Sequence, residues 1–396
     1  MKFKLAVILT LLYSCYSVNA QEISSSKFGK GVFNIVGQDS SWTMKIGTRF
    51  QFLATNLMQD GESPETSFLI RRARLKFDGY AVSPKLKYKI ELGLSNRDMS
   101  ETSAFTGNTP RYVMDAVLKY NFYENFELWV GQTKLPGNRE RVISSANMQQ
   151  VDRSILNARF NIDRDIGFQL RHHLKITNNF IVREILAVSQ GEGRNIVTGN
   201  LGGHQYTGRV EFLPMGNFTG KGDYSGSDLK REQTPKLSIG ISYDFNNNAV
   251  KTRSNQGSYM VTDTGFYETN ITTLFIDSMF KYRGFSLMTE FADRNADDPI
   301  AKNSDDTETG DVVQVGTGLN VQGGYLFKSN WEVSGRYSTV NLDKNITGIM
   351  PETQYTLGLS RYIVGHSLKV QSDISYIDVA NQGEQFLYRL QFDIHF

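Results

Sequence analysis

The sequence predicts an all-β protein, a transmembrane antiparallel barrel of about 16 strands with short periplasmic turns and long extracellular loops. Three observations lead to this fold class. Apolar and polar side chains alternate within repeated segments of about ten residues. The connections between these segments alternate between a few residues and roughly ten or more. The final segment alternates up to a terminal aromatic residue, Phe396.

The N-terminus has the features of a secretory signal peptide. Two lysines precede an apolar run over residues 5–12, and small residues lead up to Ala20. We therefore expect cleavage near Ala20, so that 1–20 is a signal peptide and 21–40 is a periplasmic leader. The alternative is a lipoprotein acylated at Cys15, although Tyr and Ser before that cysteine form a poor signal for acylation.

Removing residues 1–20 takes away the only cysteine and two lysines. The 43 Lys and Arg residues become 41, which equals the 41 Asp and Glu residues. A formally neutral mature chain gives no support to nucleic-acid binding. No later segment approaches the ~20 consecutive apolar residues of a membrane helix, which excludes a helical membrane protein but not a barrel.

The first strands show the clearest pattern. Residues 42–52 alternate, and residues 68–95 form a hairpin around a tight turn at 82–84. Apolar side chains occupy one face of this hairpin, and lysines and arginines occupy the other. A face with so many charges is unusual over a soluble core and normal for a water-filled lumen.

The remaining strands follow in order, with residues 214–235 as a long connection where a short turn is expected. The strands near 180–189 and 270–282 have the weakest patterns, so totals of fourteen or eighteen also fit. The expected strands are 114–122, 126–130, 164–174, 180–189, 205–213, 237–245, 270–282, 285–291, 312–327, 331–340, 354–363, 367–377 and 385–396. A soluble β-sandwich does not explain the alternation of connection lengths.

The last strand carries an aromatic or aliphatic side chain at every second position from Phe386 to Phe396. This resembles the C-terminal signal that the barrel assembly machinery reads in outer-membrane proteins. The resemblance implies that Tyr388, Phe392 and Phe396 belong to that signal, and that the assembly machinery is a partner during biogenesis. The alternative is the ordinary last strand of a soluble sheet.

Catalytic and metal-binding patterns are absent from the sequence. None of the five histidines lies in a metal-ligand spacing, and no nucleophile elbow or phosphate-binding glycine loop occurs. We therefore expect no enzyme, no cofactor and no metal site.

Basic residues gather in the first three strands and in one long connection. A charge facing lipid at the midplane costs roughly 2–4 kcal/mol, so we expect these side chains in the lumen, where they favour anions. The alternative is a generally polar wall whose cations pair with carboxylates of other strands. The lumen candidates are Lys45, Arg49, Arg72, Arg74, Lys76, Lys85, Lys87 and Lys89. The candidates in the long connection 134–163 are Lys134, Arg139, Arg141, Arg153 and Arg159.

Several segments resemble the phosphate-selective porin O and P family. They are Arg71–Leu75 with Asp78-Gly79, Gly131–Lys134 with Pro136 and Arg139-Glu140, Tyr206–Phe212 and Phe396. The resemblance implies a sixteen-stranded homotrimeric outer-membrane porin that takes phosphate or polyphosphate. It also implies an inward-folded constriction loop around 134–163 containing Lys134, Arg139 and Arg141, with Arg72 and Arg74 in the channel wall.

These observations together predict a passive pore in the bacterial outer membrane for small hydrophilic solutes, with a preference for anions such as phosphate. Its partners are outer-membrane lipid and small anions, without nucleic acid. Two alternatives remain open, a non-selective general porin and a closed-lumen structural or adhesive barrel. A plugged transporter of twenty-two strands is excluded because 376 residues remain after cleavage of 1–20 from the 396-residue chain.

Overall fold

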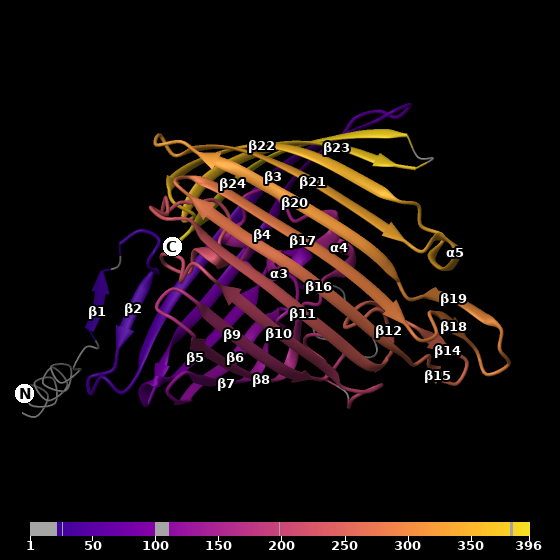
Figure 1. The fold of residues 1–396 in the computed structure, drawn as a ribbon, viewed down its shortest axis with the longest axis horizontal. Coiled ribbons are helices and arrows are strands. Elements are labelled where there is room, and N and C mark those ends of the chain that lie inside the picture. Colours follow the sequence, from indigo (N-terminus) through magenta and orange to yellow (C-terminus); the bar gives the residue numbers. More distant parts are fainter. Residues whose placement is uncertain (1–21, 26, 100–110, 198, 381–382) are drawn as a thin grey trace, which may run out of the picture.

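Sixteen strands of the described chain form a closed antiparallel barrel (Figure 1). The computed structural model describes residues 22–25, 27–99, 111–197, 199–380 and 383–396. The expected signal peptide and Cys15 lie outside these residues. The barrel strands are β3 (Thr43–Gln59), β4 (Glu65–Ala81), β5 (Ser83–Gly93), β6 (Val113–Tyr123), β7 (Phe126–Lys134), β8 (Arg164–Lys175), β9 (Ile181–Ser189), β10 (Gln205–Leu213), β11 (Lys236–Ala249), β16 (Thr269–Tyr282), β17 (Phe285–Ala296), β20 (Gly316–Leu326), β21 (Trp331–Leu342), β22 (Glu352–Val364), β23 (Leu368–Val379) and β24 (Glu384–His395).

Each barrel strand pairs with its neighbours in sequence, and β24 pairs with β3 to close the ring. The predicted fold class and the total of about sixteen strands are therefore confirmed. The weakly patterned strands at 180–189 and 270–282 are present as β9 and β16. One expected boundary is wrong. The predicted loop at 54–67 is mostly strand, because β3 and β4 keep pairing as far as Leu57 and Glu65.

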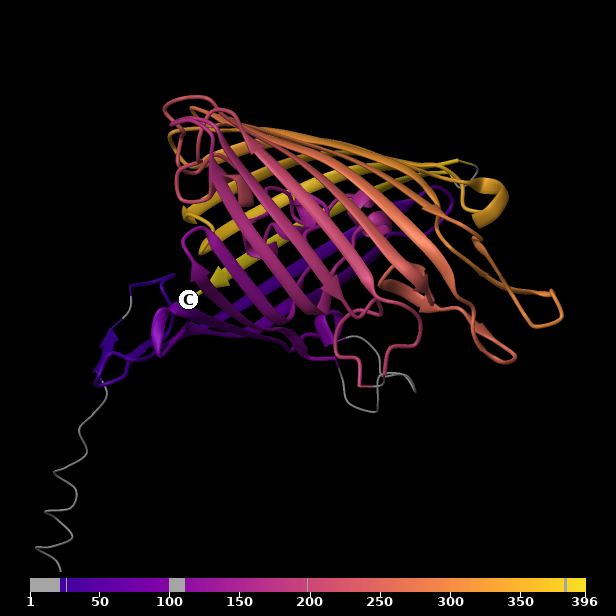
Figure 2. The same cartoon turned by 60° about the horizontal axis from the view of Figure 1, so that its bottom comes forward.

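Short strands and helices lie in the N-terminal segment and in the loops. A hairpin of β1 (Glu22–Ser25) and β2 (Phe33–Val36) extends from the start of β3 at the rim that also holds the C-terminus (Figures 1 and 2). The loops hold β12 (Lys251–Arg253), β13 (Gln256–Tyr259), β14 (Val261–Thr262), β15 (Gly265–Phe266), β18 (Ile300–Lys302), β19 (Glu308–Val312), α2 (Asn96–Met99), α3 (Arg139–Val142), α4 (Ile155–Phe160) and α5 (Lys344–Thr347). In the part of the chain that the structure describes, no helix is long and apolar enough to cross a membrane.

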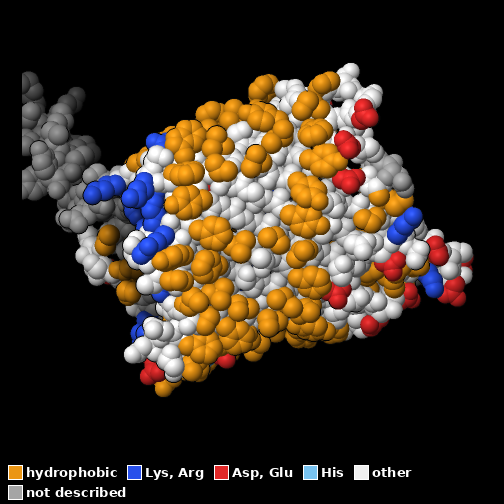
Figure 3. Space-filling view, turned by 45° about the horizontal axis from the view of Figure 1, so that its top comes forward, with side chains coloured by type: hydrophobic (Ala, Val, Ile, Leu, Met, Phe, Trp, Pro, Cys, Tyr) orange, Lys and Arg blue, Asp and Glu red, His pale blue; other side chains and the backbone are white. Residues whose placement is uncertain are grey.

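The period-two pattern sorts side chains between the outside and the lumen. On β3, Phe50 and Phe52 are exposed on the outside, while Arg49 and Gln51 between them are 7% and 0% exposed. Figure 3 shows the result on one face, where apolar side chains cover a broad band. Lysines and arginines gather at one edge of this band, and carboxylates gather at the other. This band is the surface that a lipid bilayer covers.

A β-bulge alters the alternation on β4. Gln51 pairs with Arg72 and the next residue, Phe52, pairs with Ile70, so Arg71 is the extra residue. Arg71 and Arg72 are consequently both buried on the lumen side, with 5% and 3% of their surfaces exposed. Strict alternation would have pointed one of them at lipid. The bulge therefore places two adjacent guanidinium groups inside the barrel.

The seam between the first and last strands contains a buried ion pair. Arg49 Nε and Nη2 donate to Asp393 Oδ1 and Oδ2 at 2.9 and 2.7 Å. Arg49 Nη1 also donates to Ser145 Oγ at 2.7 Å. One guanidinium thus ties β3 and β24 to each other and to the segment inside the barrel.

We predict that Asp393→Ala destabilises the barrel by about 3–5 kcal/mol, because it leaves the Arg49 charge buried without a counter-ion. Urea unfolding of detergent-folded protein, followed by its heat-modifiable gel shift, measures the loss. The matched control is the double variant Arg49→Met/Asp393→Leu, which removes both charges and is expected to lose less. Equal losses in the single and double variants would contradict this account.

Candidate functional site

Residues 135–163 lie inside the ring of strands, where α3 and α4 appear in both ribbon views (Figures 1 and 2). Side chains of the barrel wall hold this inner loop by its backbone carbonyls. Arg209 donates to Gly137 O at 3.0 Å, Arg294 to Phe160 O at 2.6 Å, and Lys369 to Met148 O at 2.9 Å. These donors come from β10, β17 and β23, so the inner loop is anchored across one side of the barrel.

Apolar packing holds the inner loop against the same side of the barrel. Leu156 and Phe160 of α4 are fully buried in a cluster with Phe275 of β16 and Ala292 of β17. Gly318 on β20 makes room for this packing, because a Cβ at that position would lie 2.9 Å from the Phe160 ring. The inner loop thus fills the half of the lumen beside β10–β23 and leaves the half beside β4–β9 open.

Arg139 anchors the inner loop and does not reach the open channel. Its side chain is fully buried, and its Nε donates to Asp277 Oδ1 at 2.7 Å. Its remaining donors contact Asp223 O and Ser238 Oγ, each at 3.0 Å. The sequence placed Arg139 with the channel-facing candidates, whereas the structure places it between the loop and the wall.

Two lysines bind backbone carbonyls in the same manner. Lys134 Nζ donates to the carbonyls of Arg141, Val142 and Ile143 at 2.7, 3.3 and 3.1 Å, which fixes the end of α3. Lys281 Nζ donates to three successive carbonyls, those of Ser225, Gly226 and Ser227, at 2.9, 3.2 and 2.5 Å. Each ammonium satisfies carbonyls of a segment that has no sheet partner.

The second of these segments, residues 214–235, connects β10 to β11 at the rim of short turns. It enters the lumen, where Asp223 accepts from Arg183 at 2.5 Å and Tyr224 donates to Glu211 at 2.7 Å. It also contacts the inner loop, because Gly226 N donates to Asn147 O at 2.6 Å. The sequence marked this segment only as an unusually long turn and gave no signal that it folds inward.

A cavity of about 990 Å³ occupies the open half of the lumen. Its described lining contains sixteen lysines and arginines but only six carboxylates, an excess of ten positive charges. The basic lining residues are Arg71, Arg72, Arg74, Lys89, Arg97, Lys119, Lys134, Arg141, Arg153, Arg164, Arg171, Lys175, Arg183, Arg194, Lys221 and Arg253. The acidic ones are Glu91, Asp98, Asp115, Glu127, Asp152 and Asp163. Positive charge is therefore concentrated in the open half of the lumen.

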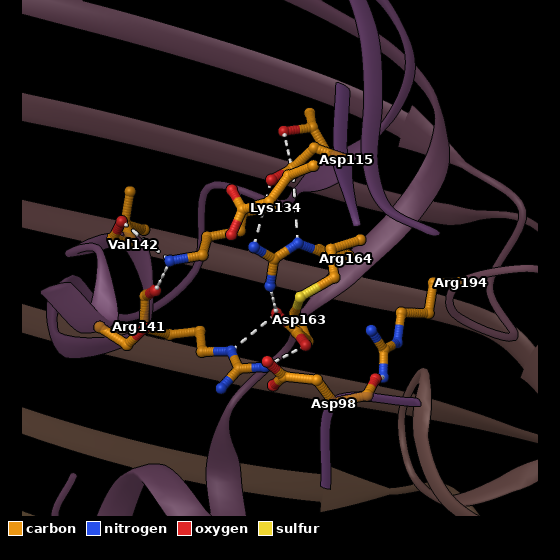
Figure 4. A network of polar contacts seen from close by, with 12 residues as sticks. Asp98, Asp115, Lys134, Arg141, Val142, Asp163, Arg164 and Arg194 are labelled. Atoms are coloured by element: carbon orange, nitrogen blue, oxygen red, sulfur yellow. Dashed lines mark hydrogen bonds and ion pairs between the residues drawn. The ribbon is translucent and has the colours of Figure 1, made fainter. Parts of the chain in front are cut away.

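Figure 4 shows the ion-pair network beside the inner loop. Arg164 Nε donates to Asp115 Oδ1 at 3.2 Å, and Arg141 Nε donates to Asp163 Oδ1 at 2.7 Å. Burial opposes the charge on Asp163, but Arg141 and Arg164 hold its pKa well below the ordinary range. Asp163 therefore stays ionised and keeps Arg141 and Arg164 in fixed positions beside the cavity.

Arg74 makes a similar network nearer the first strands. Its Nε and Nη2 donate to Asp98 at 2.7 and 2.9 Å, and its Nη1 donates to Glu91 at 2.8 Å. Burial opposes the charge on Asp98, yet the hydrogen bonds and charge of Arg74 lower its pKa to about 2. Arg194 donates to the backbone carbonyl of Asp98 and extends this network to the next loop.

The other sequence-predicted residues divide between the cavity and the periphery. Arg72, Arg74, Lys89, Lys134, Arg141 and Arg153 line the cavity. Lys45, Arg49, Lys76, Lys85, Lys87, Arg139 and Arg159 do not line it. Lys76 pairs with Asp78 at 2.7 Å, and Arg159 lies 3.8 Å from Glu352.

Sequence reasoning missed several lining residues. Arg71 was left out of the candidate set because the bulge that turns it inward has no clear signature in the alternation. Lys119 and Arg183 are the single lysine or arginine of β6 and β9, so neither strand shows a basic face. Arg171 lies on β8, where basic residues occur at both odd and even positions and alternation marks no basic face. Among the described residues, no group of three or more His, Cys, Asp or Glu side chains is placed to hold a metal ion.

A lipid-facing barrel with a polar lumen that an inner loop narrows is the architecture of an outer-membrane porin. The family model of phosphate-selective porins O and P matches residues 44–389. The chain therefore belongs to the phosphate-selective porin O and P family, and it is an integral protein of the outer membrane. The rim of short turns is accordingly the periplasmic one.

Solved structures share this fold at low sequence identity. An anion-selective porin from Comamonas acidovorans superposes with a TM-score of 0.56 and 11% identity, covering 90% of this chain and 100% of that chain. A trimer form of OmpT, an outer membrane protein of Vibrio cholerae, gives a TM-score of 0.53 and 13% identity, with coverage of 90% and 100%. No curated protein sequence matches the chain.

We predict that Lys281→Met frees residues 214–235 from the periplasmic half of the lumen, because three carbonyls lose their donor. Trypsin cleavage after Lys230 or Arg231 in the folded barrel should then become about tenfold faster, and the open-channel current should become noisier. The control is Lys328→Met, which removes an exposed lysine from a turn at the same rim. Equal cleavage rates in the two variants would contradict the proposed anchor.

Proposed function

We propose that this porin is a passive, anion-preferring channel for small hydrophilic solutes, of which phosphate-class oxyanions are the main ones. The observation that carries this proposal is the excess of ten positive charges in the lining of the open half of the lumen. A formally neutral chain can select anions because the field in a pore depends on the charges beside the solute path and not on the total charge.

The arrangement of the lining supports transport of oxyanions more than that of halides. Arg71 and Arg72 adjoin at the bulge, and both line the cavity. Their only acidic neighbour within 4 Å in the described chain is Asp152, at 2.9 and 3.7 Å. Two guanidinium groups beside one carboxylate keep a net positive charge at the cavity, and the planar fork of a guanidinium suits the several oxygens of phosphate.

The comparisons support the proposal in two further ways. The family is described as phosphate-selective, and the Comamonas acidovorans porin with the same fold is anion-selective. We extend both descriptions to this chain as part of the proposal. We further propose residues 134–163 as the constriction loop, with Lys134, Arg141 and Arg153 as its lumen-facing cations and Arg72 and Arg74 as cations of the facing wall.

We also propose a homotrimer, a cleaved signal peptide over 1–20 and a periplasmic leader over 21–40. The OmpT structure of the same fold is a trimer form, which supports the first of these. The apolar outer band supports outer-membrane lipid as the surrounding phase. We propose the barrel assembly machinery as the partner that reads the C-terminal strand. The proposal assigns the chain no catalysis, cofactor or metal.

Reversal potentials in planar bilayers under a KCl gradient test the proposal directly. We expect the purified protein to prefer chloride over potassium. Arg71→Gln/Arg72→Gln should lower the anion-to-cation permeability ratio by about two- to fivefold, because two of the positive charges that concentrate anions beside the path are lost. The control is Lys302→Gln/Lys328→Gln, which removes the same charge outside the cavity.

Cation preference of the unmodified protein would refute the anion channel and leave a general porin. An equal change in both double variants would show that net charge, and not the lining, sets selectivity. Folded, heat-modifiable protein that gives no conductance steps would favour the closed-lumen barrel instead.

A further inference from the structure

Trp129 lies inside the lumen in the periplasmic part of the cavity. It is on β7, between the periplasmic turn that precedes Phe126 and the start of the inner loop after Lys134. Two cations from the neighbouring strands lie against its indole ring. Lys119 Nζ of β6 is 3.7 Å from the ring centroid, and Arg171 Cζ of β8 is 3.8 Å from it.

Neither cation has an acidic partner. Within 4 Å of Lys119 and Arg171 the described chain has no carboxylate, in contrast to Arg164 and Arg74. Arg171 Nε and Nη2 both donate to the neutral Gln169 Oε1, at 3.3 and 2.9 Å. The adjacent Glu127 accepts from the Trp129 indole N–H at 2.9 Å, so the ring holds this carboxylate.

An indole stabilises cations in a different way from a carboxylate. The negative face of the ring attracts an ammonium or guanidinium group without cancelling its charge. Two such charges held at one ring therefore keep their full attraction for a third, negatively charged partner. A structural ion pair has no such capacity, because its charges already compensate each other.

We propose that Lys119, Trp129 and Arg171 form an oxyanion-binding subsite on the periplasmic side of the inner loop. This inference rests on the proposed anion channel and adds a second position at which a phosphate-class solute is held after it passes the loop. Phosphate can accept from the Lys119 ammonium and from the Nη1 of Arg171, for which the structure gives no partner among the described residues. The nearby Glu127 repels anions, but its single negative charge stands against the two positive charges of Lys119 and Arg171.

The indole is also a built-in reporter. The chain has three tryptophans, and the other two, Trp42 and Trp331, lie outside the cavity lining. The double variant Trp42→Phe/Trp331→Phe therefore leaves Trp129 as the only source of tryptophan fluorescence. Titration of this folded variant with sodium phosphate at constant ionic strength, with sodium chloride as the comparison, reports binding beside the ring.

We expect a saturable fluorescence change with phosphate and none with chloride. Lys119→Met and Arg171→Met, each in the same background, should raise the apparent Kd for phosphate at least fivefold. Lys328→Met in that background is the control, since it removes an exposed lysine of a periplasmic turn and should leave the Kd unchanged. The heat-modifiable gel shift establishes that each variant is folded.

Two results would overturn the subsite, a response to phosphate no different from that to chloride, or a Kd that neither Lys119→Met nor Arg171→Met changes. The reversal potential of the single-tryptophan protein separates this failure from that of the proposed function. Anion preference without a phosphate-specific signal refutes the subsite alone. Cation preference refutes the anion channel on which the subsite depends.

Discussion

The structure depends on hydrogen bonds that barrel-wall side chains donate to the backbone of a loop inside the lumen. A backbone segment without a sheet partner needs other donors for its carbonyls. Arg209, Arg294 and Lys369 supply them to residues 135–163 from strands on one side of the barrel. These contacts hold the loop against that side of the barrel. The channel consequently runs along the opposite side.

A neutral chain can have a strongly positive channel because its charges are segregated between the open side of the lumen and the rest of the molecule. Carboxylates such as Asp277, Glu290 and Asp373 lie on the packed side, where each contacts a side chain or backbone N–H of the inner loop or the wall. The arginines of β4 and β8 lie on the open side of the lumen, where carboxylates are fewer than basic side chains. Selectivity in this account arises from where the loop lies as much as from which residues the strands carry.

The alternating pattern of the sequence was enough to predict the fold but only part of the site. Polar-apolar alternation and connection lengths were enough to predict the barrel and most of its strands, because each strand carries its own signal. The bulge at Arg71, the burial of Arg139 and the inward path of 214–235 depend on contacts between residues 18 or more positions apart. Spacing along one strand holds no record of such contacts, so Lys119 and Arg171 could not be placed around Trp129 from the sequence.

Cysteine accessibility tests the division of the lumen most directly. Cys15 is the only cysteine of the chain and lies in the expected signal peptide, so single cysteines can be introduced against a clean background. We expect a negatively charged thiol reagent to modify Lys89→Cys in the open half rapidly and to reduce the current. Ser242→Cys, at a fully buried position of β11 beneath the inner loop, should not react. Rapid modification and block at Ser242→Cys would contradict a loop packed against that wall.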